Sequence, residues 1–112
     1  RELSVMKETG FLKVIADRSF NEKVVIINPN DGFDLGLMMT EATVVLYRGD
    51  SLDVLEDPNA ETVYARIYQK NECKLGTVEL GFRNVDKLGN PGQVRLHMVD
   101  GSPYPKLLLA TV

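Results

Sequence analysis

The chain has 112 residues and a mass of 12.5 kDa, a length that suits a single domain. Its composition, 44% hydrophobic and 26% charged, is that of a globular protein and argues against an intrinsically disordered chain. The net charge of −3 argues against a basic nucleic-acid module, which would present a positive surface. The lone cysteine, Cys73, excludes an internal disulfide and a zinc site built from cysteines.

The apolar runs of the sequence are short. The longest has four residues, whereas a membrane-spanning helix needs about 20, so we expect no such helix. No signal peptide is visible at the start, and the first residue is Arg1 rather than Met. We therefore interpret 1–112 as one domain, consistent with a fragment of a longer protein. The domain would be cytoplasmic or the soluble part of a membrane-anchored protein.

Hydrophobic residues alternate with polar ones along most of the chain, which is the period of strands with one face on a core. In chain order, strands are predicted at residues 11–16, 22–27, 43–47, 63–68, 77–83, 93–98 and 106–112. The second and third of these are more continuously apolar, as interior strands can be. Short helices are candidates at residues 1–9, 37–42 and 51–56.

Turn sequences rich in Gly, Pro, Asn and Asp separate the predicted strands at short intervals. In the segment 32–36, Gly32 and Gly36 are expected to supply positive φ rather than a phosphate-binding loop. About seven short strands of this kind predict an all-β protein, an antiparallel β-sandwich of Ig or fibronectin-III type. A small closed β-barrel is the alternative. In a sandwich, Arg66, Arg95 and His97 would blunt edge strands. No internal repeat is visible.

Candidate catalytic residues are few. His97 is the only histidine and falls on the polar side of its predicted strand, which favours a solvated histidine over a general base. Cys73 lies in a turn between Lys70 and Lys74, which could lower the pKa of its thiol. No orienting partner is readable for either residue, so a space-filling cysteine is favoured and no enzyme is predicted. The tripeptide 48–50, Arg-Gly-Asp, is interpreted as a simple hairpin turn.

Several aspartates fall in or near turns. The candidate metal ligands are Asp31, Asp34, Asp57 and Asp100. If three of them met at one end of a sandwich, their oxygens could hold Ca²⁺, as in C2-type domains. Their spacing matches no calcium loop such as the EF-hand, and solvated turn aspartates are the simpler explanation.

One predicted strand carries a candidate binding surface. Tyr64, Arg66 and Tyr68 share one face, with one tyrosine ring on each side of the arginine guanidinium. Bases can stack on such a platform, but the acidic net charge argues against nucleic acid as a partner. A protein partner or a membrane surface is therefore expected.

Part of the sequence resembles the plant LEA-14/WHy family (LEA type 2), which includes the NDR1/HIN1-like defence proteins. The similar segments are VVIINPN at 24–30, LGL at 35–37, ATVVLYRG at 42–49 and, in style, GQVRLHMVDG at 92–101. The family shows a hydrophobic strand ending in Asn-Pro, a short strand containing Gly, and a strand closing on Tyr. The sequence departs from this pattern in an insert at 31–34 and in the region 53–59. The resemblance implies a fibronectin-III-like sandwich without catalysis, with Asn28 and Pro29 as structural turn residues.

The sequence as a whole predicts a binding or structural module rather than an enzyme. The resemblance implies a role in stress tolerance or defence. A calcium- or lipid-dependent C2-like membrane module is one alternative, and a self-assembling viral or phage subunit is another.

Overall fold

The computed structural model describes residues 6–111, which form seven strands and three short helical segments. The elements are β1 (Met6–Asp17), β2 (Val24–Ile27), α1 (Pro29–Asp34), β3 (Glu41–Gly49), the 3₁₀ helix η1 (Leu52–Glu56), β4 (Val63–Gln69), β5 (Thr77–Gly81), α2 (Phe82–Lys87), β6 (Gln93–Val99) and β7 (Lys106–Thr111). None of the helices in this part of the chain is long and apolar enough to cross a membrane.

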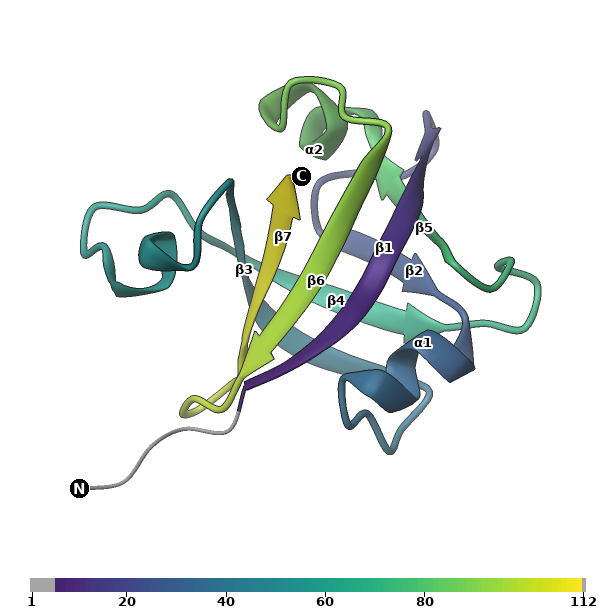
Figure 1. The fold of residues 1–112 in the computed structure, drawn as a ribbon, viewed down its shortest axis with the longest axis horizontal. Coiled ribbons are helices and arrows are strands. Elements are labelled where there is room, and N and C mark those ends of the chain that lie inside the picture. The colour runs from purple at the N-terminus through teal and green to yellow at the C-terminus, as the bar shows by residue number, and fades with distance from the viewer. Residues whose placement is uncertain (1–5, 112) are drawn as a thin grey trace.

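The strands form one closed barrel in the order β1-β5-β2-β4-β3-β7-β6 (Figure 1). The all-β class and the seven strands are confirmed, and of the two expected architectures the barrel is the one that forms. Three of the seven neighbouring pairs are parallel: β1 with β5, β2 with β4 and β3 with β7. Parallel pairs need crossover connections, which an antiparallel sandwich does not supply. The fold therefore adds no support to the LEA-14/WHy resemblance, which implies a sandwich.

A repeat that the sequence does not reveal is present in the topology. The series β1-β2-α1-β3 is followed by β4-β5-α2-β6, with the same order of elements. In this comparison β1 corresponds to β4, β2 to β5 and β3 to β6. The parallel pair β1–β5 then corresponds to the parallel pair β4–β2, and the antiparallel pair β1–β6 to the antiparallel pair β4–β3. The two helices lie near opposite ends of the barrel (Figure 1).

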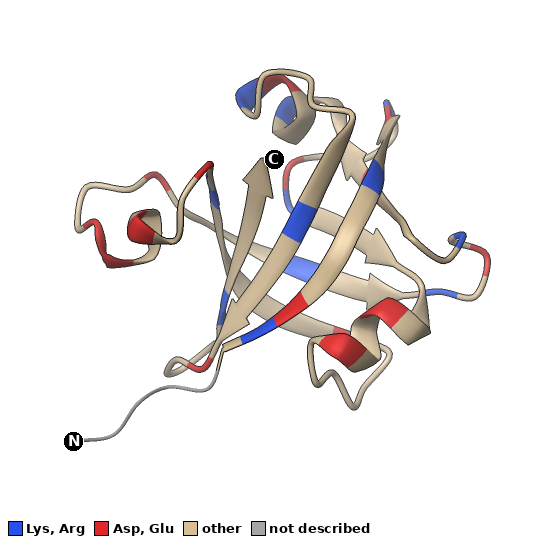
Figure 2. Ribbon diagram, in the orientation of Figure 1, with Lys and Arg blue, Asp and Glu red and all other residues tan. Residues whose placement is uncertain are grey.

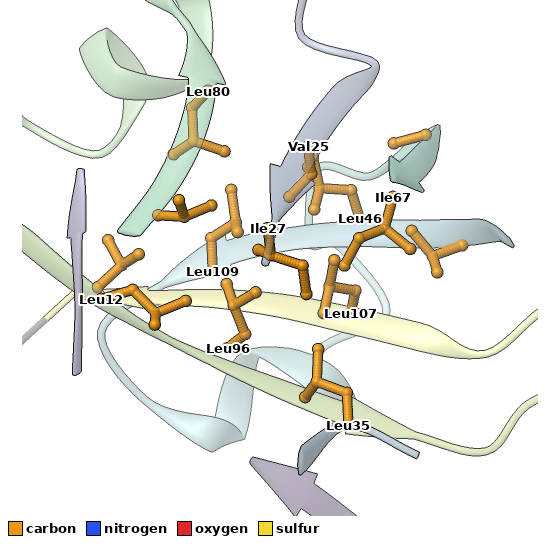
Figure 3. Packing of buried hydrophobic residues seen from close by; sticks show 14 of the residues in the cluster. Leu12, Val25, Ile27, Leu35, Leu46, Ile67, Leu80, Leu96, Leu107 and Leu109 are labelled. Atoms are coloured by element: carbon orange, nitrogen blue, oxygen red, sulfur yellow. The ribbon is translucent and has the colours of Figure 1, made fainter. Parts of the chain in front are cut away.

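The barrel interior is filled by the inward residues of all seven strands (Figure 3). Fully buried side chains include Leu12, Val25, Ile27, Val44, Leu46, Ile67, Val78, Leu80, Val94, Leu96, Leu107 and Leu109. A second, smaller cluster lies outside the barrel, where Leu55 of η1 covers Tyr47 of β3 and Leu108 of β7. These two strands read as continuously apolar because both of their faces are buried.

The short helices differ from expectation. Of the three candidates, only 51–56 is confirmed, as η1, whereas 37–42 forms no helix and residues 6–9 belong to β1. Residues 1–5 lie outside the described residues. The helix α1 arises where a turn is predicted, because Asn28 caps it by accepting a hydrogen bond from Asn30 N (2.8 Å) and Pro29 suits its first turn. The helix α2 replaces the end of the predicted strand 77–83.

Two expectations about local geometry are corrected in part. Gly36 has φ +74°, as expected, but Gly32 is helical and has no positive φ. An added Cβ at Gly32 would meet the end of the Gln69 side chain, which is flexible and can move aside. No strand of the closed barrel is an edge strand with a single neighbour, so Arg66, Arg95 and His97 do not have the blunting role expected of them.

Candidate functional site

The outer face of β4 carries the three residues predicted to form a binding surface. Ala65 and Ile67 point into the barrel, so the alternating residues Tyr64, Arg66 and Tyr68 lie outside, as the period-two pattern predicts. The exposed fraction is 61% for Tyr64, and Tyr68 is half-buried. The Lys70 ammonium lies 5.6 Å from the ring centre of Tyr68, which leaves the Tyr64 end of the strand more open.

A hollow of about 270 Å³ opens on this face. It is lined by residues of two neighbouring strands, β3 and β4, and of the turn before β2: Lys23, Thr43, Tyr64, Ala65 and Arg66. Beside it, Tyr104 from the β6–β7 loop packs edge to face on Tyr64, with ring centres 5.8 Å apart and planes at 77°. The structure therefore brings Tyr64 and Arg66 together with groups distant in sequence, whereas Tyr68 does not line the hollow.

Of the two cationic side chains that line the hollow, one has a carboxylate partner and the other has none among the described residues. Arg66 forms an ion pair with Glu41 of β3, with N and O 2.9 Å apart and both side chains about half exposed. Lys23 makes no ion pair with any residue in the described range 6–111. The hollow therefore has one exposed aromatic ring in its lining, a second ring packed against that one, and the Lys23 ammonium, which can meet an incoming negative group.

Sequence reasoning did not find Lys23, Thr43 or Tyr104. Each comes from a different part of the chain, and only the pairing of β2 and β3 with β4 places the first two beside Arg66. The strand periodicity could not indicate that Tyr104 lies beside Tyr64, because Tyr104 belongs to the loop before β7.

The expectation of a solvated His97 is wrong. His97 has an exposed fraction of 8%, and its Nδ1 lies 3.2 Å from Glu8 Oε1 without making a hydrogen bond. Burial lowers the pKa of His97 and outweighs the opposite effect of Glu8, while Arg95 lowers it further. His97 lies on the outer face of β6, opposite the inward residues Leu96 and Met98, and its lowered pKa favours the neutral imidazole at neutral pH.

Cys73 is buried rather than activated. Its exposed fraction is 1%, and its Sγ lies 3.4 Å from Thr77 O and 3.6 Å from Ile26 O. Burial, with Glu79 and Asp31 nearby, raises the pKa of the Cys73 thiol to about 12. The expected lowering by neighbouring lysines is therefore wrong, and the thiol packs as a small apolar group.

The four candidate calcium ligands are spread over three parts of the described fold. Asp31 and Asp34 belong to α1, Asp57 follows η1 and Asp100 follows β6. Asp31 is buried and accepts a hydrogen bond from Gly76 N at 2.9 Å. Within residues 6–111, no three His, Cys, Asp or Glu side chains gather closely enough to hold a metal ion.

The Arg-Gly-Asp tripeptide at 48–50 is not a simple hairpin turn, because η1 and the residues around it separate β3 from β4. The Arg48 side chain is only 7% exposed and lies within 3.5 Å of both Glu22 and Glu61. Arg48 NH1 also donates to Asn84 Oδ1 of α2 at 2.6 Å. This network ties α2 to the barrel and keeps Arg48 from acting as an exposed recognition residue.

Comparisons with protein-family models, curated proteins and solved structures found no match to this chain. The candidate site therefore rests on the geometry of β4 and its neighbours.

Proposed function

We propose that the protein is a non-catalytic binding module that recognises a protein partner through the outer face of β4. The observation that carries the proposal is the pair of packed tyrosines beside the hollow, Tyr64 and Tyr104, with Arg66 and Lys23 at its border. Tyrosine and arginine dominate the energetic centres of protein interfaces, because they combine large contact area with hydrogen bonding. Basic and acidic residues are interspersed over the ribbon (Figure 2).

A peptide selection tests this proposal. Random peptides displayed on phage are selected against the protein, and enriched peptides are measured again by titration. Loss of a central tyrosine anchor costs about 2 kcal/mol, so we expect Tyr64→Ala to weaken binding about 30-fold. The matched control is Phe33→Ala, an aromatic residue with an exposed fraction of 79% away from the hollow. Binding that survives Tyr64→Ala, or falls equally in Phe33→Ala, would contradict the proposal.

A second candidate function, contact with a membrane surface, is favoured by a separate observation. Phe33, Met38 and Met39 are 79%, 94% and 70% exposed in the segment from α1 to β3. Such a group of exposed large apolar side chains is a feature of interaction sites. Sedimentation with phosphatidylcholine vesicles tests this alternative, with loss of sedimentation expected in Met38→Ser and none in Tyr64→Ala.

The resemblance to the LEA-14/WHy family suggests stress tolerance or defence as the biological setting. The complete reading frame and its expression under drought or infection would test that part of the proposal.

A further inference from the structure

The strand β4 continues beyond its neighbour on one side of the barrel. The first residue pair between β2 and β4 is Val24 with Arg66, whereas β4 begins at Val63. On its other side, β4 pairs with β3 along its length, from Leu46 opposite Val63 to Glu41 opposite Tyr68. The segment Val63–Ala65 therefore has a paired strand on one side only.

The hydrogen bonds identify the open main-chain groups in this segment. Arg66 N donates to Lys23 O at 2.8 Å, so the main chain of Tyr64, two residues earlier, faces the same side. A continued parallel ladder would join Lys23 N to Tyr64 O, but Lys23 N donates to Asn21 Oδ1 at 2.7 Å instead. Within residues 6–111, the N–H and C=O of Tyr64 thus have no main-chain partner.

The topological repeat gives a comparison for this open edge. In the other half of the barrel, β1 extends past β5, whose pairing begins only at Lys13. There α1 packs against β1, and the Lys7 side chain lies over Gly36. The equivalent helix α2 packs mainly against β1 and β5, so it gives β4 no corresponding cover. Among the described residues, the edge at Tyr64 thus has neither a paired strand on that side nor a helix packed mainly against its strand.

The charges beside this edge favour a negative ligand. Lys23 borders both the hollow and the open edge, and it is the cation there without a carboxylate partner in the described range. The nearest carboxylates already contact cations: Glu41 pairs with Arg66, and Glu22 pairs with Arg48. An incoming carboxylate would therefore meet an unpaired ammonium rather than compete for an occupied one.

We propose that Val63–Ala65 is the docking edge for an extended, acidic segment of a partner protein, which adds as a strand beside β4. The segment bonds to the N–H and C=O of Tyr64 and directs a carboxylate to Lys23. A neighbouring side chain of the segment packs in the hollow against Tyr64. This inference rests on the proposed function and specifies its partner and mode of binding. Because the edge is short, the affinity of an isolated peptide is expected to be micromolar to millimolar.

The probe is a capped hexapeptide of alternating valine and glutamate. It is titrated into the ¹⁵N-labelled protein, up to millimolar peptide, and binding is measured by NMR. We expect the Tyr64 amide to shift and its hydrogen exchange to slow. Methylating the peptide main-chain nitrogen that pairs with Tyr64 should weaken binding at least 10-fold, because it removes the donor without changing charge. A valine–lysine peptide should bind at least 10-fold more weakly.

A protein variant separates the charge contribution from folding. Lys23→Glu should weaken binding of the valine–glutamate peptide at least 10-fold, whereas the matched control Lys13→Glu, on the exposed face of β1, should not. The melting temperature of each variant verifies folding, and the methylated peptide tests the same edge without any variant. Equal binding of the methylated peptide, an unchanged Tyr64 amide or no binding would overturn the inference. If phage-selected peptides still require Tyr64 in that case, the proposed function stands and only the strand-addition mode fails.

Discussion

Replacing Arg48 by methionine should destabilise the protein far more than the same replacement at Arg66. Both arginines are ion-paired, and the Arg66–Glu41 pair is the closer, at 2.9 Å against 3.5 Å for Arg48 and Glu22. They differ in burial, since the Arg48 side chain is 7% exposed and that of Arg66 is 52% exposed. If burial governs the energy, the longer pair is the more important one.

The magnitude follows from the groups that Arg48 would leave behind. Asn84 is fully buried, and its Oδ1 would lose the 2.6 Å hydrogen bond from the guanidinium. An unsatisfied buried acceptor costs about 1–3 kcal/mol. Glu22 is partly exposed and keeps Arg83 and Lys87 nearby, so its share is small. We expect a loss of about 2–3 kcal/mol, or about 8–12 °C in melting temperature at about 4 °C per kcal/mol.

Urea unfolding followed by circular dichroism measures both variants. Arg66→Met should cost less than about 1 kcal/mol, because water screens the exposed pair. A double variant with Asn84→Leu should lose less than the sum of the single losses, since it removes both partners of one hydrogen bond. Equal losses in Arg48→Met and Arg66→Met would refute the argument from burial.

Three further predictions concern single residues. The pKa of His97, measured by NMR titration, should lie below the ordinary histidine value of 6.5. Because the folded pKa is lowered, the contribution of His97 to stability is present above pH 6.5 and is lost as the pH falls toward the folded pKa. A titration midpoint at or above 6.5 would contradict this prediction. Cys73, with its thiol pKa raised to about 12, should react with a disulfide reagent at pH 8 at least about 100-fold more slowly in the native protein than in urea, and equal rates would disprove its burial. Gly81→Ala should cost about 1–3 kcal/mol by calorimetry, because the added Cβ meets the carbonyl oxygens of Phe20 and Asn21, whereas Gly10→Ala, with nothing within 4 Å, should cost clearly less; similar losses would count against this steric reason.

The period-two pattern of a strand predicts part of the candidate site but not all of it. The alternation along β4 correctly places Tyr64, Arg66 and Tyr68 on one face, because successive side chains of any strand point to opposite sides. It cannot identify the residues across from them. Lys23 and Tyr104 join Tyr64 only because the barrel brings the turn before β2 and the loop before β7 to β4.

The sequence by itself determined the all-β class, the approximate positions of the seven strands and several of the turns, since these depend on periodicity and on the local preferences of Gly, Pro and Asn. Only the tertiary structure decided that the strands close into a barrel with three parallel pairs. It also decided that Arg48 and His97 are buried, although both occupy positions that read as polar. The physical reason is that a period of two specifies which face of a strand is apolar, but not which strand lies beside it or what covers its outer face.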